Sequence, residues 1–285
     1  MVLLSATLLT EREQVTLVAV LVAILLVFAS VIVFVAFLKS ILVMLRVTFI
    51  ISNIADKSRQ AIGRQLPPED SYVLCQAEPL AKPDQVIAYG RPPRRLFASR
   101  HTQGVLQAIQ TATLVKFARR HGCALRIIPR HGDYLNQGDP LVEVYGASGL
   151  EAEGVLAAFH VGPERTITQD PAYGLRILVD IALQALSPAV NAPTTASQVL
   201  YRLTDLLALI AHKPAPTGLY VDSDCQLRLV RPTYTWEDHV DLAFDEIRFY
   251  GIDQPQTRQQ LTRSLDYLLD TVPEGCRAAL EHQKE

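Results

Sequence analysis

The chain has 285 residues, of which 49% are hydrophobic and 20% charged, and its formal net charge is −2 at pH 7. This length accommodates a membrane segment together with one sizeable domain or two small ones. The soluble part is net acidic and carries no recognisable nucleic-acid-binding module, which argues against a nucleic acid as partner.

The N-terminal part contains one long apolar run. Val15–Phe37 spans 23 residues without a charge, Pro, Gly, Asn or Gln. As a helix this run would be roughly 34 Å long, enough to cross the hydrocarbon core of a bilayer. It is longer than the apolar region of a signal peptide, and no basic segment precedes it. We therefore predict a retained transmembrane helix over 15–38 after a short extracytoplasmic N-terminus over 1–14.

Basic residues flank this run unequally. Only Arg12 precedes it, whereas five basic residues follow it: Lys39, Arg46, Lys57, Arg59 and Arg64. Because the basic flank of a membrane helix stays inside, we expect the C-terminal part to lie in the cytoplasm, beneath a bacterial inner membrane. The four cysteines are scattered and form no C-x-x-C pair, which fits a reducing compartment: Cys75, Cys123, Cys225 and Cys276.

Residues 39–65 are predicted to form a long juxtamembrane helical stalk. Its polar residues recur every seven positions and share one helix face: Lys39, Arg46, Asn53 and Gln60. The favoured interpretation is an amphipathic stalk outside the bilayer, with Lys39 extending to the interface. The alternative is that this polar seam lines an oligomeric interface or a pore.

Residues 66–148 are predicted to form a small β-rich module with helices. Strands are expected over 71–76, 85–89, 94–99 and 123–129, and helices over 105–109 and 112–120, the second ending at Gly122 in a left-handed cap. Between Arg126 and Val144, two Gly-Asp turns separate short strands. This pattern resembles biotinyl/lipoyl-like domains, but no Lys occurs between Lys116 and Lys213 to carry such a group. We therefore expect no cofactor.

The charge of the soluble part is segregated along the chain. Residues 91–131 contain nine Lys/Arg and no Asp/Glu, whereas residues 133–285 contain 11 basic and 22 acidic residues. The favoured interpretation is two separately solvated surfaces. The alternative is that the basic segment faces anionic lipid headgroups or an anionic ligand, through Arg91, Arg94, Arg95, Arg100, Arg119 and Arg120.

Residues 149–285 are predicted to be mainly helical. Asp170-Pro171 begins a helix that Ser187-Pro188 ends, and a second helix runs from near Thr194 to Pro214. A hairpin-like piece over 219–230 is followed by a helix that begins at a Thr235/Asp238 capping box, and a last helical pair begins at Asp253. The predicted class is therefore α+β: a β module followed by a helical layer, behind a membrane helix.

Residues 160–196 read HVGPERTITQDPAYGLRILVDIALQALSPAVNAPTTA. This segment closely resembles the signature of the domain of unknown function 2254 family of predicted bacterial membrane proteins, approximately R-T-x-x-x-D-P-x-[FY]-G-[LI]-x-x-L-V-D-I-A-x-x-A-L-S-P-x-x-N-D-P-x-T-A. The likeness covers roughly residues 15–270 and implies a membrane location without an established reaction. Ala192 replaces the family Asp before the second Pro. Family members usually have several N-terminal transmembrane helices, of which this chain is expected to retain the last.

The segment from Arg165 to Thr194 is the candidate site. Its polar side chains could hold an anion or ion, or could brace the fold, and bracing is the favoured interpretation: Arg165, Thr166, Gln169, Asp170, Asp180, Ser187, Asn191 and Thr194. Arg165 could pair with Asp170 or Asp180, and Arg176 with Asp180. The motifs of common hydrolases and nucleotide-binding enzymes are absent, and the seven histidines show no metal-ligand spacing.

These features together predict a homo-oligomeric, membrane-anchored protein whose cytoplasmic domain assembles or senses a ligand. Its expected partners are the lipid bilayer, further copies of itself and a small anionic ligand. The main alternative is a channel or transporter subunit with Lys39 and Arg46 on a pore-lining seam. A membrane-bound enzyme is the third hypothesis and the least favoured, and no metal is expected.

Overall fold

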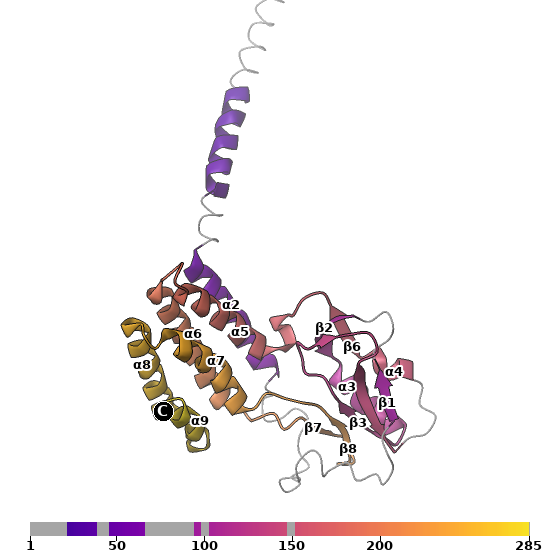
Figure 1. The fold of residues 1–285 in the computed structure, drawn as a ribbon. Helices are drawn as coiled ribbons and strands as arrows, with labels where there is room; N and C mark the ends of the chain where they lie inside the picture. The colour runs from indigo at the N-terminus through magenta and orange to yellow at the C-terminus, as the bar shows by residue number, and fades with distance from the viewer. Residues whose placement is uncertain (1–21, 39–45, 66–93, 98–102, 147–151, 285) are drawn as a thin grey trace, which may run out of the picture. The chain divides into compact units, whose positions relative to one another are not determined.

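The computed structural model describes residues 22–38, 46–65, 94–97, 103–146 and 152–284 (Figure 1). The chain divides into two compact units, Met1–Ile50 and Ile51–Glu285. Residues 22–38 are helical and exposed. Among the residues described, no helix combines the length and apolar character needed to cross a bilayer. Residues 15–21 of the predicted span and Lys39 of the polar seam lie outside the described residues.

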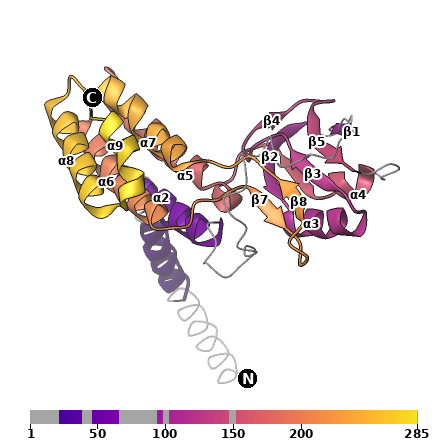
Figure 2. The same cartoon turned by 90° about the horizontal axis from the view of Figure 1, so that it is seen from below.

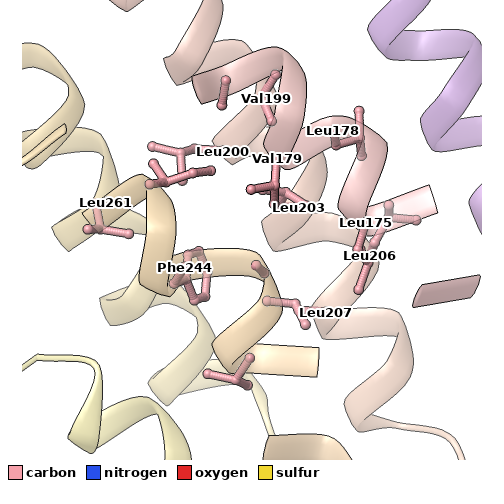
Figure 3. Close-up of a cluster of buried hydrophobic side chains, with 14 of the residues drawn as sticks. Leu175, Leu178, Val179, Val199, Leu200, Leu203, Leu206, Leu207, Phe244 and Leu261 are labelled. Carbon is pink, nitrogen blue, oxygen red and sulfur yellow. The ribbon is translucent and has the colours of Figure 1, made fainter. Parts of the chain in front are cut away.

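A helical layer forms one part of the second unit (Figures 1 and 2). Its helices are α2 (Val47–Gln65), α5 (Pro171–Leu186), α6 (Pro193–Ala211), α7 (Trp236–Gly251), α8 (Pro255–Thr271) and α9 (Arg277–His282), with a 3-10 turn, η2, at Glu274–Cys276. Apolar side chains from all six of these helices meet in one core, where Leu178, Leu203 and Phe244 are fully buried, and Figure 3 shows part of it. Burial of this shared apolar face is the main stabilising term of the layer.

Local sequence signals set the helix starts. The Asp170 side chain accepts a hydrogen bond from the Tyr173 backbone nitrogen at 3.1 Å, and Pro171 is the first residue of α5. Before α7, Thr235 Oγ1 accepts from the Asp238 backbone nitrogen while Asp238 Oδ2 accepts from the Thr235 nitrogen. The predicted N-cap and the predicted capping box are therefore both confirmed.

The second half of the expected stalk packs into the helical layer. One face of α2 is buried, through Ile51, Ala55, Ser58, Ala61 and Ile62. Gly174 of α5 allows the close approach, because a Cβ there would lie 1.9 Å from Ser58 Oγ. The opposite face of α2 is exposed and carries Asn53 and Gln60. Residues 51–65 are thus not a free-standing stalk, because their small and apolar side chains pack against α5 and other helices of the layer.

The β module contains two sheets. The five-stranded sheet has the order β1 (Arg94–Phe97), β5 (Pro140–Tyr145), β3 (Ala124–Ile127), β8 (Leu227–Val230), β7 (Leu219–Val221), and β3 pairs with β8 in parallel. The three-stranded sheet has the order β4 (Tyr134–Leu135), β2 (Gly104–Ile109), β6 (Phe159–Gly162). The module also contains helices α3 (Thr111–Arg120) and α4 (Ala152–Leu156). Apolar side chains from both sheets and both helices form a second core.

The structure confirms the α+β class and corrects one element. The helix expected over 105–109 is wrong: these residues form β2, because Leu106 and Ile109 point into the core and the backbone pairs with β6. The Gly-Asp turns between short strands are confirmed, and Gly132 and Gly138 have φ values of +86° and +83°. Strands expected over 71–76 and 85–89 lie outside the described residues. Strands β6, β7 and β8 come from beyond residue 148, so β structure is not confined to 66–148.

Candidate functional site

An ion pair between Arg165 and Asp170 lies at the centre of the candidate site. Arg165 follows β6, and a 3-10 turn, η1 (Ile167–Gln169), leads directly to Asp170 at the start of α5. Arg165 Nε donates to Asp170 Oδ2 at 2.6 Å, and the side chains are 25% and 3% exposed. Burial alone would lower the pKa of Arg165, but the hydrogen bond and the charge of Asp170 raise it. The pairing that the sequence left open is therefore made with Asp170.

Three further residues fix the Arg165 guanidinium. It lies over the Tyr173 ring, 5.0 Å from the ring centroid, and Nη2 donates to the Tyr234 hydroxyl at 3.4 Å. The backbone of Gly132 passes so close that a Cβ at that position would lie 2.1 Å from Arg165 Nε. Tyr234 and Gly132 carry no sequence signal linking them to Arg165, because this contact depends on tertiary packing.

A groove opens beside Arg165 and the exposed face of α2. It has a volume of about 500 Å³, and its polar lining includes Lys57, Gln60, Arg64, Arg165, Thr166 and Tyr173. We call these residues the cationic groove. Three basic side chains line it and no Asp or Glu does. Such a groove is suited to an anion, because guanidinium and ammonium groups provide charged donors and the hydroxyl groups provide neutral ones.

A small, more enclosed cavity lies close to Asp170. It has a volume of about 60 Å³, and its polar lining includes Arg130, His131, Gln169, Asp170, Arg231 and Tyr234, which we call the histidine cavity. His131 is 9% exposed. Burial, and then the charge of Arg231, lower the pKa of His131 to about 4, while Gln169 opposes the shift. His131 is therefore neutral near pH 7.

The remaining predicted residues do not join Arg165. Asp180 accepts from Arg176 at 2.6 Å, as predicted for an i, i+4 pair, and its side chain is 55% exposed. Arg176 also pairs with Glu246 of α7. Ser187 caps the C-terminus of α5, and Asn191 lies in the turn before α6 with a φ of +44°. Thr194 Oγ1 accepts a hydrogen bond from Gln256 Nε2 at 3.4 Å. The N-cap of α6 is Ala192, which supplies no side-chain hydrogen bond.

The basic segment is exposed where the structure describes it. Arg94, Arg95, Arg119 and Arg120 are all on the surface. Arg95 forms an ion pair with Glu143 at 3.1 Å, and Arg119 forms one with Asp224 at 3.0 Å. Arg91 and Arg100 lie outside the described residues. Within the described ranges, no three His, Cys, Asp or Glu side chains are grouped to hold a metal.

The cysteines differ from the expectation of an entirely reduced set. Cys225 is disulfide-bonded, whereas Cys123 and Cys276 are free. Cys225 has a φ of +57° and lies in the turn between β7 and β8. Its partner lies outside the described residues. The cysteine content therefore gives no support to a reducing compartment.

The fold and the site together define an α+β domain with a partly buried arginine–carboxylate pair beside a cationic groove. The profile of the family of predicted membrane proteins named domain of unknown function 2254 matches residues 1–267, and the chain belongs to this family. The family assignment inferred from the signature is thereby confirmed. No solved structure matches the chain.

Similar proteins occur in mycobacteria. The uncharacterized protein Rv1290c of Mycobacterium tuberculosis is 30% identical over 237 residues, which are 79% of this chain and 43% of that protein. The uncharacterized protein Mb1321c of Mycobacterium bovis matches to the same extent. The aligned region is thus less than half the length of these relatives.

Proposed function

We propose that this protein is a membrane-anchored sensor whose domain, Ile51–Glu285, binds a phosphate-bearing anion in the cationic groove. The observation that carries the proposal is the convergence of Lys57, Arg64 and Arg165 on one groove without an acidic residue in its lining. Arg165 is already positioned by Asp170 and Tyr173, so little side-chain entropy remains to be lost on binding.

The proposed anchor is the apolar run Val15–Phe37, of which the described part, from residue 22, is helical. Helix α2 begins ten residues after this run ends and contributes Lys57 and Arg64 to the groove. The excess of basic residues after the run supports a cytoplasmic domain beneath a bacterial inner membrane. With the cysteines giving no support, the orientation rests on this charge asymmetry alone.

A phosphate group could reach the groove as a soluble phosphomonoester or as a phospholipid headgroup. The test titrates the full chain with glycerol phosphate by calorimetry, first in nanodiscs of neutral phosphatidylcholine. In a second arm the same titration is made in nanodiscs that also contain phosphatidylglycerol. We expect glycerol phosphate to bind, and to bind at least tenfold more weakly to Arg64→Gln, because one charge-assisted hydrogen bond is lost. Lys116→Gln, an exposed basic residue on α3, is the matched control.

If wild type and Arg64→Gln bind equally, or if neither phosphate source binds, the proposal is wrong. Glycerol phosphate that binds in neutral nanodiscs but not in phosphatidylglycerol nanodiscs would identify the lipid headgroup as a competing occupant. In that case the groove is still the phosphate-binding site, and its ligand in the membrane is the lipid headgroup.

Self-association is the second part of the proposal. Arg46, Asn53 and Gln60 are all exposed, at a spacing of seven residues, and Val47 and Phe49 are exposed at the start of α2. When copies of the chain pack together along such a face, its polar side chains can hydrogen-bond to one another and its apolar side chains are removed from water. Mass photometry in nanodiscs should then show more than one copy. Conductance across planar bilayers that changes in Arg46→Ala would instead favour the channel alternative.

A further inference from the structure

The histidine cavity contains two buried polar atoms that nothing in the described part of the chain satisfies. His131 Nε2 and Arg231 Nε both have no hydrogen-bond partner. His131 is nine-tenths buried, and both residues line the cavity. An orphaned guanidinium donor is costly in a folded protein, because burial removes its water without replacing the lost hydrogen bond. Two such atoms at one cavity indicate a missing occupant.

The charges around the cavity indicate the sign of that occupant. Arg130 and Arg231 line it, and the ion pairs found among the described residues use other arginines. The one carboxylate in the lining, Asp170, is held by Arg165 at 2.6 Å. Among the residues that the structure describes, these two guanidinium groups therefore have no counter-charge, which favours an anion.

The other contacts of Arg231 and Arg130 are with uncharged groups. Arg231 Nη1 donates to Thr111 Oγ1 at 3.3 Å, and its guanidinium lies 5.7 Å from the Tyr220 ring centroid. Arg130 lies over the Tyr234 ring at 5.4 Å. These contacts are all with neutral groups. Arg231 is partly buried and is positioned by them, whereas Arg130 is exposed, and neither set of contacts neutralises a guanidinium charge.

The volume sets the size of the occupant. About 60 Å³ is roughly four to six times the ~10–15 Å³ that a cavity needs to hold one water molecule. This space is much smaller than the groove volume of about 500 Å³ and favours a ligand of few atoms. An inorganic tetrahedral oxyanion has only five heavy atoms and several acceptor oxygens, which suits two donors and two positive charges.

We propose that the histidine cavity is a binding site for a small inorganic oxyanion of the phosphate or sulfate class, held by Arg231, Arg130 and His131. The site is separate from the cationic groove and does not depend on the proposed function. It lies where the turn between β3 and β4, the start of α5 and the segment before α7 meet, so an occupant joins three segments distant in sequence.

The test isolates the cavity from the groove. Full-length Lys57→Met/Arg64→Met removes two groove charges, and its affinity for inorganic phosphate is measured by calorimetry in neutral nanodiscs. We expect one phosphate to bind per chain in this background. Adding Arg231→Met should weaken binding at least tenfold, whereas adding Lys116→Met should leave it unchanged. His131→Phe is the second cavity variant, should Arg231→Met fail to fold.

A structural role alone would give a different result. Without phosphate, Arg231→Met should unfold at nearly the same temperature as its background, because it removes the orphaned donor together with the contacts to Thr111 and Tyr220. The proposal is overturned if the groove-blocked protein binds no phosphate, which would mean that the cavity holds water only. It is equally overturned if Arg231→Met and His131→Phe bind phosphate as tightly as their background.

Discussion

Two arginine–carboxylate pairs lie eleven residues apart in the family signature and differ in their surroundings. Arg165 and Asp170 are 25% and 3% exposed and contact Tyr173 and Tyr234. Arg176 and Asp180 lie within α5, and Asp180 is 55% exposed. In sequence the pairs look equivalent, since each joins an Arg to an Asp four or five residues later. In the structure the first pair lies between two hollows, since Arg165 lines the cationic groove and Asp170 the histidine cavity.

This difference shows that burial decides how much the loss of one partner of an ion pair changes the stability of the fold. An exposed pair gains little, because water screens the charges and two side chains lose freedom. A buried pair costs free energy to desolvate, yet removing one partner leaves an uncompensated charge in a poorly solvated place. Arg165 and Asp170 are of the second kind. Their removal should therefore affect both folding and ligand binding.

The largest expected effect separates the two pairs directly. Asp170→Ala should lower the free energy of unfolding by about 4 kcal/mol, because Arg165 loses its partner and α5 loses its N-cap. Asp180→Ala, the matched control on the same helix, should change it by about 0.5 kcal/mol or less. Urea unfolding followed by circular dichroism measures both. Equal losses in the two variants would contradict the distinction drawn between the pairs.

Acid should destabilise the protein through His131. Its pKa is about 4 when folded and 6.5 in the unfolded reference, so the unfolded chain binds protons more readily. The contribution to stability is complete above pH 6.5 and is lost as the pH falls towards 4, on the order of 3 kcal/mol. His131→Phe should reduce this loss of stability, and the rest is expected from His239 in the same cavity, whose pKa burial also lowers. His121→Phe, at an exposed position, should leave the loss unchanged. If the pH dependence of stability is unchanged in His131→Phe, protonation of His131 does not cause the destabilisation by acid.

Two glycines with the same backbone conformation test the packing around Arg165. Gly132 and Gly138 have φ values of +86° and +83°, but only at Gly132 would a Cβ meet Arg165, while nothing lies within 4 Å at Gly138. Gly138→Ala should cost about 1 kcal/mol from backbone strain alone. Gly132→Ala should cost about 2 kcal/mol more, since Arg165 must move. Equal losses would show that the turn tolerates the extra methyl group without displacing Arg165.

The smallest predicted effect concerns the second half of the signature. Ala192 is the N-cap residue of α6 and offers no side-chain acceptor. Ala192→Asp restores the carboxylate of the family pattern and should raise the free energy of unfolding by about 1 kcal/mol. Ala192→Leu is the control, because leucine has no hydrogen-bond acceptor, and it should not raise the free energy of unfolding. A destabilised Ala192→Asp would mean that the family Asp has another role.

Helix starts and short turns could be predicted from the sequence because their signals are local. Asp170-Pro171, the Thr235/Asp238 capping box and the Gly-Asp turns each act within four residues. Residues 105–109 could not, because a short apolar stretch fits a helix or a strand until its partner is known. That partner, β6, begins at Phe159, fifty residues later.

The candidate site shows the same limit. The sequence drew attention to Arg165, Gln169 and Asp170, which the structure brings together. It gave no reason to add His131, Arg231 or Tyr234, since these reach the site only through the β module and the segment before α7. The second half of the signature was included on sequence proximity alone. Ser187 and Thr194 form local contacts instead.

The central claim is that an anion is bound where Lys57, Arg64 and Arg165 converge. Cryo-electron microscopy of the full chain in nanodiscs, with and without glycerol phosphate, tests it most directly. The account predicts ligand-dependent density within hydrogen-bonding distance of the Arg165 guanidinium and of at least one α2 cation, which disappears in Arg64→Gln. A groove that stays empty at saturating ligand, or density that persists in Arg64→Gln, would contradict it.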